Sequence, residues 1–359
     1  MNETSPDGIV LLAKKPGLTS FSSLNSIKKA IGTKKVGHTG TLDSFAQGLL
    51  VVCTGRLTRL AGNIIEFDKE YRAVIKFGQE TDTLEYTGKV VKEAPLPKVQ
   101  DFENAVKKFT GDFMQKPPVF SAIHVDGQRA SDLIRSGQEA EIPARPVTVH
   151  KAQILETKVN AQNQVEYALI DFIVSKGTYI RSLARDIANE CNSAGHLVGL
   201  YRTRVGNFDI KQAAGLSRLP EFTIEKVIAE MIIQKEIYEK SILERNNLAK
   251  QSKKDCKKER KIYIPDQEEL QLQEEIRQKK EDFSEETAKL CGFNIIHLLN
   301  DDGNADFQNG RPLRSKLFDT NLHTLPNNSI TAVFTKESFF AGLIDKDLGG
   351  RIHYRFVVN

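Results

Sequence analysis

A strand that is apolar on both faces constrains the fold of this chain more than any other feature. In "VEYALIDFIVSKG", residues 165–177, the alternating positions on either side are largely apolar, which suits a central strand covered on both faces. Directly after it, apolar residues recur at helical spacing over residues 180–191, which predicts an amphipathic helix. The sequence therefore predicts a mixed α/β domain in which Tyr179 and Arg181 lie at a strand-to-helix junction.

The same pattern extends over residues 8–219. "GIVLLAKKPG" predicts a buried strand that ends at a Pro-Gly turn, and "EYRAVIKFG" predicts another strand. Between them, apolar residues at helical spacing over residues 21–31 predict a helix, with Thr19 or Ser20 as its N-cap. We expect residues 1–220 to form one domain.

The composition changes after this domain. Residues 221–288 are rich in charge and predict a helical connector, either solvated and partly disordered or carrying an RNA-binding arm around Lys250–Lys261. Residues 289–359 predict a small β-rich C-terminal domain. Its expected short strands are "NGRPL", "SITAVF", "SFFAGLID" and "RIHYRFVV".

Composition narrows the class of protein. A chain of 359 residues is long for a single compact core, so a large domain and a smaller one are expected. The net charge of +4 is weak, and a nucleic-acid partner would need a local basic surface. The four cysteines show no CxxC spacing, and no uncharged apolar run approaches the roughly 20 residues of a membrane span. We therefore expect a soluble protein of the reducing cytoplasm that does not bind membranes.

One carboxylate in a Gly/Thr-rich loop has two interpretations. "KKVGHTGTLDSFAQGLL" places Asp43 among glycines and threonines, just before an apolar run. Such an aspartate either forms a turn or cap or acts as a catalytic carboxylate. The chain has no GxxxxGK[ST], no GxGxxG after a strand, no HExxH and no GxSxG motif, so we expect no cofactor and no metal.

The order of several motifs resembles that of one known family. Over about residues 8–210 the sequence resembles the bacterial tRNA pseudouridine synthases of the TruB type. The matching blocks are, in order, "GIVLLAKKPGLTSF", "KVGHTGTLDSFAQGLLVVCTGRLTRL", "KEYRAVIKFGQETDTLEYTG", "KPPVFSAIHVDGQRASDLIRSG" with "ARPVTV", "SKGTYIRSLARDIA" and "GHLVGLYRTRVGNF".

The resemblance implies a fold, a reaction and a substrate. The fold would be the pseudouridine synthase fold, a large mixed, mainly antiparallel sheet flanked by helices, with a small β-rich C-terminal domain that is PUA-like in many members. The reaction would detach uracil from its ribose, rotate it and rejoin it through carbon. The substrate would be the uridine at position 55 in the T-loop of tRNA. We expect no guide RNA and a monomeric enzyme.

The resemblance also implies roles for individual residues. Asp43 matches the catalytic aspartate, which acts either as a nucleophile on the sugar or as the acceptor of a sugar proton. Arg181 matches the arginine that pairs with this carboxylate and orients it. Tyr71 matches the tyrosine that stacks on the target base and can assist proton transfer. Tyr179 and Leu200 match a second pocket tyrosine and an apolar wall.

Reaching a uridine inside a folded loop would require base flipping. His38 matches the histidine that fills the vacated place in the base stack, although it can alternatively hydrogen-bond the loop backbone. Recognition would combine shape, stacking and phosphate contacts. The basic residues expected to contact phosphates are Lys14, Lys15, Lys34, Lys35, Arg56, Arg59, Arg129 and Arg202.

The chain departs from the family pattern at several positions. "KKP" at residues 14–16 replaces the usual Asp-Lys-Pro, and Ser44 replaces the proline that usually follows the catalytic aspartate. The serine removes some backbone stiffness, so lower catalytic efficiency is expected. Ser131 and Leu133 stand where aromatic residues are common, which weakens the expectation of base stacking there.

Two other functions remain as alternatives. The first is a non-catalytic RNA-binding or tRNA-folding module that retains the pocket by descent, which the complete set of pocket residues disfavours. The second is a guide-RNA-dependent pseudouridine synthase of the archaeal and eukaryotic kind, which the bacterial "GHTGTLD" loop disfavours.

Overall fold

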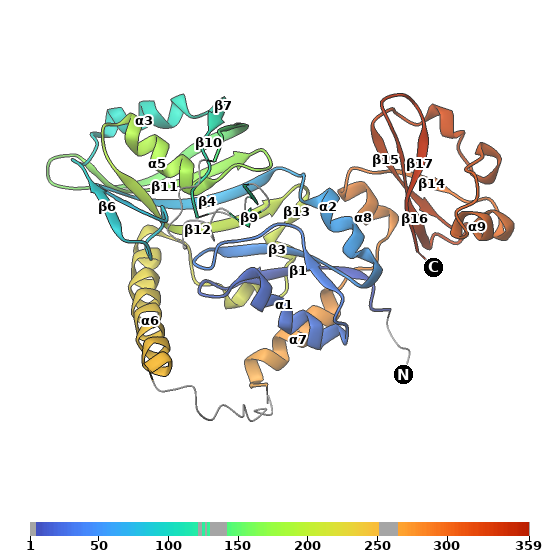
Figure 1. The fold of residues 1–359 in the computed structure, drawn as a ribbon, viewed down its shortest axis with the longest axis horizontal. Coiled ribbons are helices and arrows are strands. Elements are labelled where there is room, and N and C mark those ends of the chain that lie inside the picture. Colours follow the sequence, from blue (N-terminus) through green and yellow to red (C-terminus); the bar gives the residue numbers. More distant parts are fainter. Residues whose placement is uncertain (1–4, 121–123, 126–127, 130–141, 251–264, 359) are drawn as a thin grey trace.

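The computed structural model describes residues 5–120, 124–125, 128–129, 142–250 and 265–358. A nine-stranded sheet and a four-stranded sheet dominate this part of the chain (Figure 1). The strands of the larger sheet are β1 (Gly8–Lys14), β2 (Val36–His38), β3 (Gln47–Thr54), β4 (Lys69–Phe77), β7 (Gly111–Gln115), β10 (Arg145–Val159), β11 (Val165–Val174), β12 (Gly195–Val205) and β13 (Phe208–Asp209).

The larger sheet is mixed but mainly antiparallel. Its strand order is β1-β3-β12-β4-β11-β10-β7, with β2 paired to β3 and β13 paired to β12. The described pairs are antiparallel except for β3 and β12, which run parallel. This architecture confirms the predicted fold class.

Helices and short hairpins surround this sheet. The helices in the described part of the chain are α1 (Ser20–Ile31), α2 (Ala61–Ile64), α3 (Val99–Lys108), α5 (Ile180–Glu190), α6 (Ile224–Lys250), α7 (Gln267–Lys279), α8 (Glu285–Leu290) and α9 (Asp301–Gln308). Short 3-10 helices cover Gly55–Leu60, Ile210–Gln212, Leu216–Arg218, Ser315–Leu317 and Leu322–Thr324. Two hairpins lie outside the large sheet: β5 (Gln79–Thr81) with β6 (Val90–Glu93), and β8 (His124–Val125) with β9 (Gln128–Arg129).

The predicted elements of the first part are present. The predicted central strand is β11, whose residues pack into the main core with α3 and α5. The coverage of both faces that was expected for it is incomplete, because Tyr167, Asp171 and Ile173 on one face are only partly buried. The helix that follows it is α5, and it begins one residue after Tyr179. Of the two N-caps expected for α1, Thr19 is the one used, because its side chain accepts a hydrogen bond from the Ser22 amide.

The strands β1 and β3 are buried on both faces. All residues of both strands are buried. Alternate side chains such as Val10 and Leu12 pack against α1 and α7, while Ile9 and Leu11 pack toward the four-stranded sheet. Figure 1 shows α1 and α7 together beside these strands. The near-continuous apolar sequence of both strands follows from this double coverage.

The charged segment after the first part packs onto it. Ile224 and Val227 at the start of α6 lie in the main core, and Leu272 and Ile276 of α7 lie in the core beneath β1. Within the described residues, no helix is long and apolar enough to cross a membrane.

The four-stranded sheet lies at the C-terminal end of the chain (Figure 1). Its strands, in spatial order, are β14 (Asn294–His297), β15 (Ser329–Phe334), β16 (Phe340–Lys346) and β17 (Ile352–Val357). Three of the predicted strands correspond to β15, β16 and β17. The strand predicted for "NGRPL" is wrong, because this segment is a turn and loop after α9. Gly310 has a positive φ of 65° there, and Pro312 has no amide hydrogen to donate to a sheet.

Candidate active site

A cavity of about 450 Å³ opens where the loop between β2 and β3 meets β4, β12 and the start of α5. Sequence neighbours do not form this site, because its walls come from segments far apart in the chain. Five of the six residues predicted for the pocket line this cavity: Asp43, Tyr71, Tyr179, Arg181 and Leu200. The cationic side chains of Lys69, Arg145 and Arg202 also line it.

Arg181 holds Asp43 with two nitrogens. Its Nη2 donates a hydrogen bond to Asp43 Oδ1 at 3.1 Å, and its Nε lies 3.0 Å from Asp43 Oδ2. The arginine side chain is 8% exposed while the aspartate side chain is 36% exposed. A planar guanidinium fixes a carboxylate in one orientation when it meets both oxygens. The carboxylate is therefore aimed by a buried cation and still accessible from the cavity.

Two backbone carbonyls fix the arginine itself. Nη1 donates to the carbonyl oxygen of Thr83 at 3.0 Å, and Nη2 donates to that of Phe120 at 3.1 Å. Arg181 lies in the first turn of α5, whose apolar face is buried in the main core. The position of the guanidinium therefore depends on the packing of α5 against the sheet.

Tyr71 and Leu200 come from neighbouring strands. Tyr71 lies on β4, opposite Arg202 of β12, and Leu200 of β12 lies opposite Ala73 of β4. Leu200 is 5% exposed and Tyr71 is half-buried. The pair provides an apolar wall and an aromatic ring beside the carboxylate.

Tyr179 is held at the junction before α5. Its amide donates to the side-chain oxygen of Gln115 at 2.8 Å, and the Gln115 amide group donates back to the Tyr179 carbonyl at 3.1 Å. The Arg145 guanidinium carbon lies 4.8 Å from the centre of the tyrosine ring. Gln115 therefore holds the backbone of Tyr179, and the Arg145 cation lies over its ring.

His38 is not among the residues that line the cavity. It lies on β2, opposite Val52 of β3, and is half-buried. Its Nδ1 has no hydrogen-bond partner among the described residues. Burial, and after it the charge of Arg202, lowers the pKa of His38. The lowered pKa favours the neutral form of His38 near pH 7, and the cavity itself does not include this residue.

Two of the residues expected to contact phosphates are interior cations. Lys14 is 1% exposed and Arg202 is 2% exposed, so neither lies on the outer surface, although Arg202 borders the cavity. Lys14 points inward from β1, and its Nζ donates to the carbonyl oxygens of Leu18 and Ala46, each at 2.6 Å. Periodicity did not reveal this, because a lysine in an otherwise apolar strand reads as an end of the strand.

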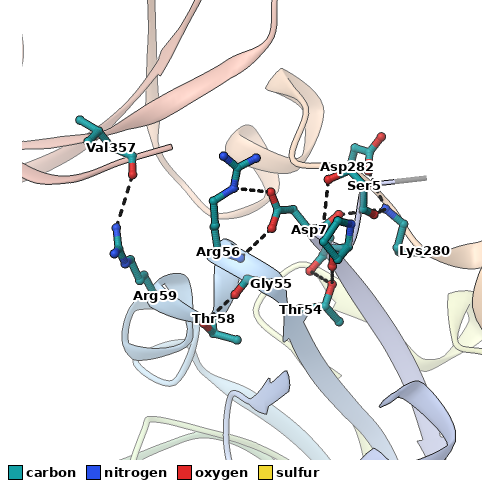
Figure 2. A network of polar contacts seen from close by, with 12 residues as sticks. Ser5, Asp7, Thr54, Gly55, Arg56, Thr58, Arg59, Lys280, Asp282 and Val357 are labelled. Carbon is teal, nitrogen blue, oxygen red and sulfur yellow. Dashed lines mark hydrogen bonds and ion pairs between the residues drawn. The ribbon is translucent and has the colours of Figure 1, made fainter. Parts of the chain in front are cut away.

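Arg56 and Arg59 lie at the contact between the N-terminal strand and the C-terminal sheet (Figure 2). The backbone amide and Nε of Arg56 donate to the two carboxylate oxygens of Asp7, at 2.7 and 2.6 Å. Arg59 reaches the carbonyl oxygen of Val357 at 3.4 Å and stacks over Phe356. Both side chains therefore serve intramolecular contacts.

The remaining expected phosphate contacts differ in their surroundings. Lys15 pairs with Glu268 at 3.0 Å, while Lys34 and Lys35 are exposed. The side chain of Arg129 lies outside the described part of the structure. So do Ser131 and Leu133, and the Lys250–Lys261 run.

Two lysines, Lys14 and Lys69, are buried near the cavity, and the sequence did not predict their burial. Burial lowers the pKa of Lys14 to about 7, partly opposed by the nearby Asp43. Burial also lowers the pKa of Lys69 to about 8; its Nζ donates to the carbonyl oxygens of Ile65 and Phe67, each at 2.5 Å. The only sequence signal for both was a lysine adjoining a buried strand.

No group of three or more metal-ligating side chains occurs among the residues that the structure describes. The side chains that line the cavity are a carboxylate, cations, aromatic rings and aliphatic groups.

Comparison of the sequence with those of known proteins identifies relatives of this chain. Residues 28–180 match the family described as TruB family pseudouridylate synthase (N terminal domain). A protein named tRNA pseudouridine synthase B from Treponema denticola is 46% identical over 235 residues, which are 62% of this chain and 66% of the relative. One of the same name from Caldanaerobacter subterraneus subsp. tengcongensis is 41% identical over 219 residues, 60% of this chain and 75% of the relative.

The fold is also similar to that of a solved structure. A chain from the crystal structure of a Cbf5-Nop10-Gar1 complex is 20% identical, with a TM-score of 0.59 over 98% of this chain and 84% of that chain. At this identity the similarity is one of fold.

Proposed function

The chain belongs to the TruB family of pseudouridylate synthases and is an isomerase of tRNA, and we propose that it converts uridine 55 in the T-loop to pseudouridine. It acts as a stand-alone monomer, without a guide RNA. Membership of the family rests on relatives that are more than 40% identical to this chain, and the match covers 75% of the length of one of them. The target position and the roles of individual residues are the proposed part.

One observation carries the proposal: a carboxylate fixed by a buried arginine inside a nucleoside-sized cavity. The volume of about 450 Å³ lies in the range of small-ligand sites, about 300–1,000 Å³. Both Asp43 oxygens contact Arg181, which aims the carboxylate. An ionised carboxylate is what either route of the reaction requires.

In the proposed reaction, Asp43 acts on the ribose of the target nucleotide. It either attacks the anomeric carbon as the glycosidic bond breaks, or it accepts a proton from the sugar. The freed uracil rotates between the Tyr71 ring and the apolar wall at Leu200, and its C5 then bonds to the anomeric carbon. In the nucleophilic route the bond between Asp43 and that carbon breaks at this step, and in the other route the sugar recovers the proton that Asp43 accepted. N1 of the base gains one proton while C5 loses one, so the product is an isomer of the substrate. Tyr71 stacks on the base and can assist removal of the proton from the base carbon.

Substrate recognition requires the uridine to leave its stack, at a cost of about a few kcal/mol. We propose that His38 compensates by occupying the vacated place. A neutral imidazole suits this task, and the lowered pKa of His38 supports it. Tyr179 completes the pocket, with the Arg145 cation over its ring.

The division of the chain is likewise a proposal. Residues 1–220 form the catalytic domain, 221–288 a helical connector, and 289–359 a PUA-like domain. A separate apolar cluster within the C-terminal sheet, with Phe307 and Ile344 at its centre, supports an independent domain there. Phe334 and Leu343 also belong to the cluster that includes β1 and β3, so the two domains are expected to be tightly docked.

The test is incubation of the purified full chain with an unmodified T-stem-loop RNA, without guide RNA or cofactor. Pseudouridine is detected by mass spectrometry after chemical derivatisation, and an RNA with cytidine at the target position is the control. Product in the first RNA alone supports the proposal. RNA binding without product would point to a non-catalytic module, and product only with added guide RNA would point to the guide-dependent class.

A further inference from the structure

Arg202 lies behind the loop that carries Asp43 and contacts it through backbone carbonyls. Its Nη2 donates to the carbonyl oxygen of Gly40 at 3.1 Å, and its Nη1 donates to that of Thr41 at 3.4 Å. Its Nε donates to the carbonyl oxygen of Leu49 at 2.8 Å. The three guanidinium nitrogens therefore join the start of the loop to β3, where the loop ends.

The acceptors explain why an arginine occupies this position. Burying a guanidinium is costly unless its donors are satisfied, and here the three bonds go to backbone carbonyl oxygens in three different directions. Arginine presents its donors in a rigid fork. A lysine has a single nitrogen and cannot span Gly40 and Leu49 together, so charge alone would not reproduce the arrangement.

The strand that carries Arg202 approaches β3 unusually closely. Arg202 of β12 lies opposite Gly48 of β3 in the parallel pair. Gly48 has a φ of +118°, and a Cβ there would lie 2.3 Å from the Arg202 carbonyl oxygen. The backbone of the arginine and its side chain therefore both contact the segment that follows Asp43.

Other side chains hold the rest of the loop. The Ser20 hydroxyl donates to the Leu42 carbonyl at 3.0 Å and accepts from the Leu42 amide at 2.8 Å. Lys14 Nζ donates to the carbonyl oxygens of Ser44 and Ala46. Arg202 is the residue in this set that fixes Gly40 and Thr41, at the start of the loop. Such fixation matters here because Ser44 lacks the stiffness of the usual proline.

We propose that Arg202 is a positioning residue, which aims the Asp43 carboxylate by clamping the loop at Gly40 and Thr41, and that it does not contact RNA phosphates. The inference rests on the proposed role of Asp43. Displacing a reacting group by about 1 Å can cost about 100-fold in rate. The clamp is therefore expected to act on kcat and to leave RNA binding unchanged.

The experiment compares Arg202→Met and Arg202→Lys with Arg204→Met. Arg204 lies two residues along β12, is about half exposed and pairs with Glu70 and Asp209, so it controls for loss of a cation on the same strand. Steady-state kinetics with T-stem-loop RNA give kcat and KM. Binding at several salt concentrations gives the slope of log K against log salt. Hydrogen exchange by mass spectrometry reports the amides of Thr39, Leu42 and Ala46, which are hydrogen-bonded in and around the loop.

For a clamp, Arg202→Met lowers kcat by about 100-fold and leaves KM within about threefold. Loop amides exchange at least about tenfold faster, the salt slope stays constant, and Arg202→Lys gives an intermediate loss. Arg204→Met changes none of these. A phosphate contact would instead reduce the salt slope by about 0.7–0.9 and weaken binding, which would overturn the proposal. Unchanged loop exchange in both Arg202 variants would also overturn it.

Hydrogen exchange tests the role of Arg202 independently of the proposed function. If the unmodified chain makes no pseudouridine, the proposed function fails, but the exchange of the loop amides still decides whether Arg202 clamps the loop. If Arg202→Met does not fold, Arg202→Lys supplies the same readouts.

Discussion

The cavity end of the nine-stranded sheet and the interior of the C-terminal sheet differ in the charged side chains that they bury. At the cavity end, Lys14, Lys69, Arg181 and Arg202 are each at most 7% exposed. Each directs its donors at backbone carbonyls, and Arg181 also contacts a carboxylate. This end of the sheet therefore accumulates buried cations around one loop and one carboxylate.

The C-terminal sheet is held mainly by aromatic and aliphatic packing. Phe334 is fully buried between the rings of Phe340, 5.6 Å away, and Phe283, 6.5 Å away. Lys346 is a buried cation there, capped by the carbonyls of His323 and Leu325. Arg355 and Asp345 form an ion pair at the surface of this sheet, with both side chains 39% exposed.

This difference implies that one region contributes mainly to catalysis and the other mainly to stability. A buried cation costs several kcal/mol in desolvation and repays it only through well-made hydrogen bonds, whereas buried apolar surface stabilises by about 25 cal/mol per Å². Substitutions at the cavity end are therefore expected to change the rate, and substitutions in the C-terminal core are expected to change the free energy of unfolding.

The largest effect is expected from Asp43→Asn. The amide cannot act as a nucleophile or a base, so kcat should fall by at least about 10⁴-fold, while RNA affinity stays within about threefold. Single-turnover assays and filter binding measure the two quantities. Asp171→Asn, which breaks an exposed pair with Arg72 on the same sheet, is the matched control and should leave kcat unchanged. A large loss of binding in Asp43→Asn would show that the carboxylate has another role.

Phe334→Ala should give the largest loss of stability. Removing a fully buried ring costs about 3–5 kcal/mol of unfolding free energy, measured by urea denaturation. Phe339→Ala, at a position that is 71% exposed, should change it by less than about 0.5 kcal/mol. The folded fraction of Phe334→Ala should keep its kcat within about threefold. A large loss of kcat in fully folded Phe334→Ala would show that the C-terminal core also contributes to catalysis.

Arg181→Lys tests the fork at the cavity end. A single ammonium cannot contact both Asp43 oxygens and the carbonyls of Thr83 and Phe120, so kcat should fall by about 100-fold. The control is Arg72→Lys in the pair with Asp171, whose side chains are 35% and 36% exposed. Exposed pairs contribute only about 0–1 kcal/mol, and no effect on kcat is expected. Equal activity of Arg181→Lys and the unmodified chain would refute the role of the fork.

The smallest effect concerns pH and the C-terminal sheet. His297 lies between two carboxylates, with Nε2 2.9 Å from Glu285 and Nδ1 3.1 Å from Asp319. Burial opposes protonation, but both carboxylates outweigh it, so the pKa of His297 is raised above its ordinary value of 6.5. The stabilisation is therefore complete below pH 6.5 and is lost as the pH rises through the raised pKa.

His297→Gln measures this contribution. The unfolding free energy of the unmodified chain should exceed that of the variant by about 0.5–1 kcal/mol near pH 5.5, given the partial exposure of both carboxylates. The difference should shrink toward pH 9. It should also shrink in strong acid, because Glu285 and Asp319 have lowered pKa values and their contribution disappears as the pH falls through them. A difference independent of pH would exclude the ion pairs as its origin.

Much of the fold was predictable from local patterns. The doubly apolar strand and the helix after it are β11 and α5, and the Thr19 cap begins α1. These predictions succeed because periodicity and caps report directly on local burial and backbone hydrogen bonds. "NGRPL" failed as a strand because its glycine has a positive φ and its proline cannot donate to a sheet, and both favour a turn.

The site was predictable as a set of residues but not as a geometry. Five predicted residues line one cavity, although their catalytic roles stay predictions. His38 lies outside the cavity lining, and Lys14 and Arg202 are interior cations where surface phosphate contacts were expected. Residue type indicates that a cation can bind phosphate, but burial decides whether it can reach one.

The sequence by itself determined the strands and helices, the family, and Asp43 as the carboxylate to examine, because each of these depends on neighbouring residues or on an ordered set of motifs. Only the tertiary structure decided which cations face the cavity, which face loop carbonyls, and how the C-terminal sheet joins β1 and β3. These properties depend on contacts between segments more than 100 residues apart, such as Arg202 with Gly40 and Arg181 with Asp43. The energies of these contacts depend on how deeply the charged groups are buried and on the direction of their hydrogen bonds, and no local sequence pattern encodes either property.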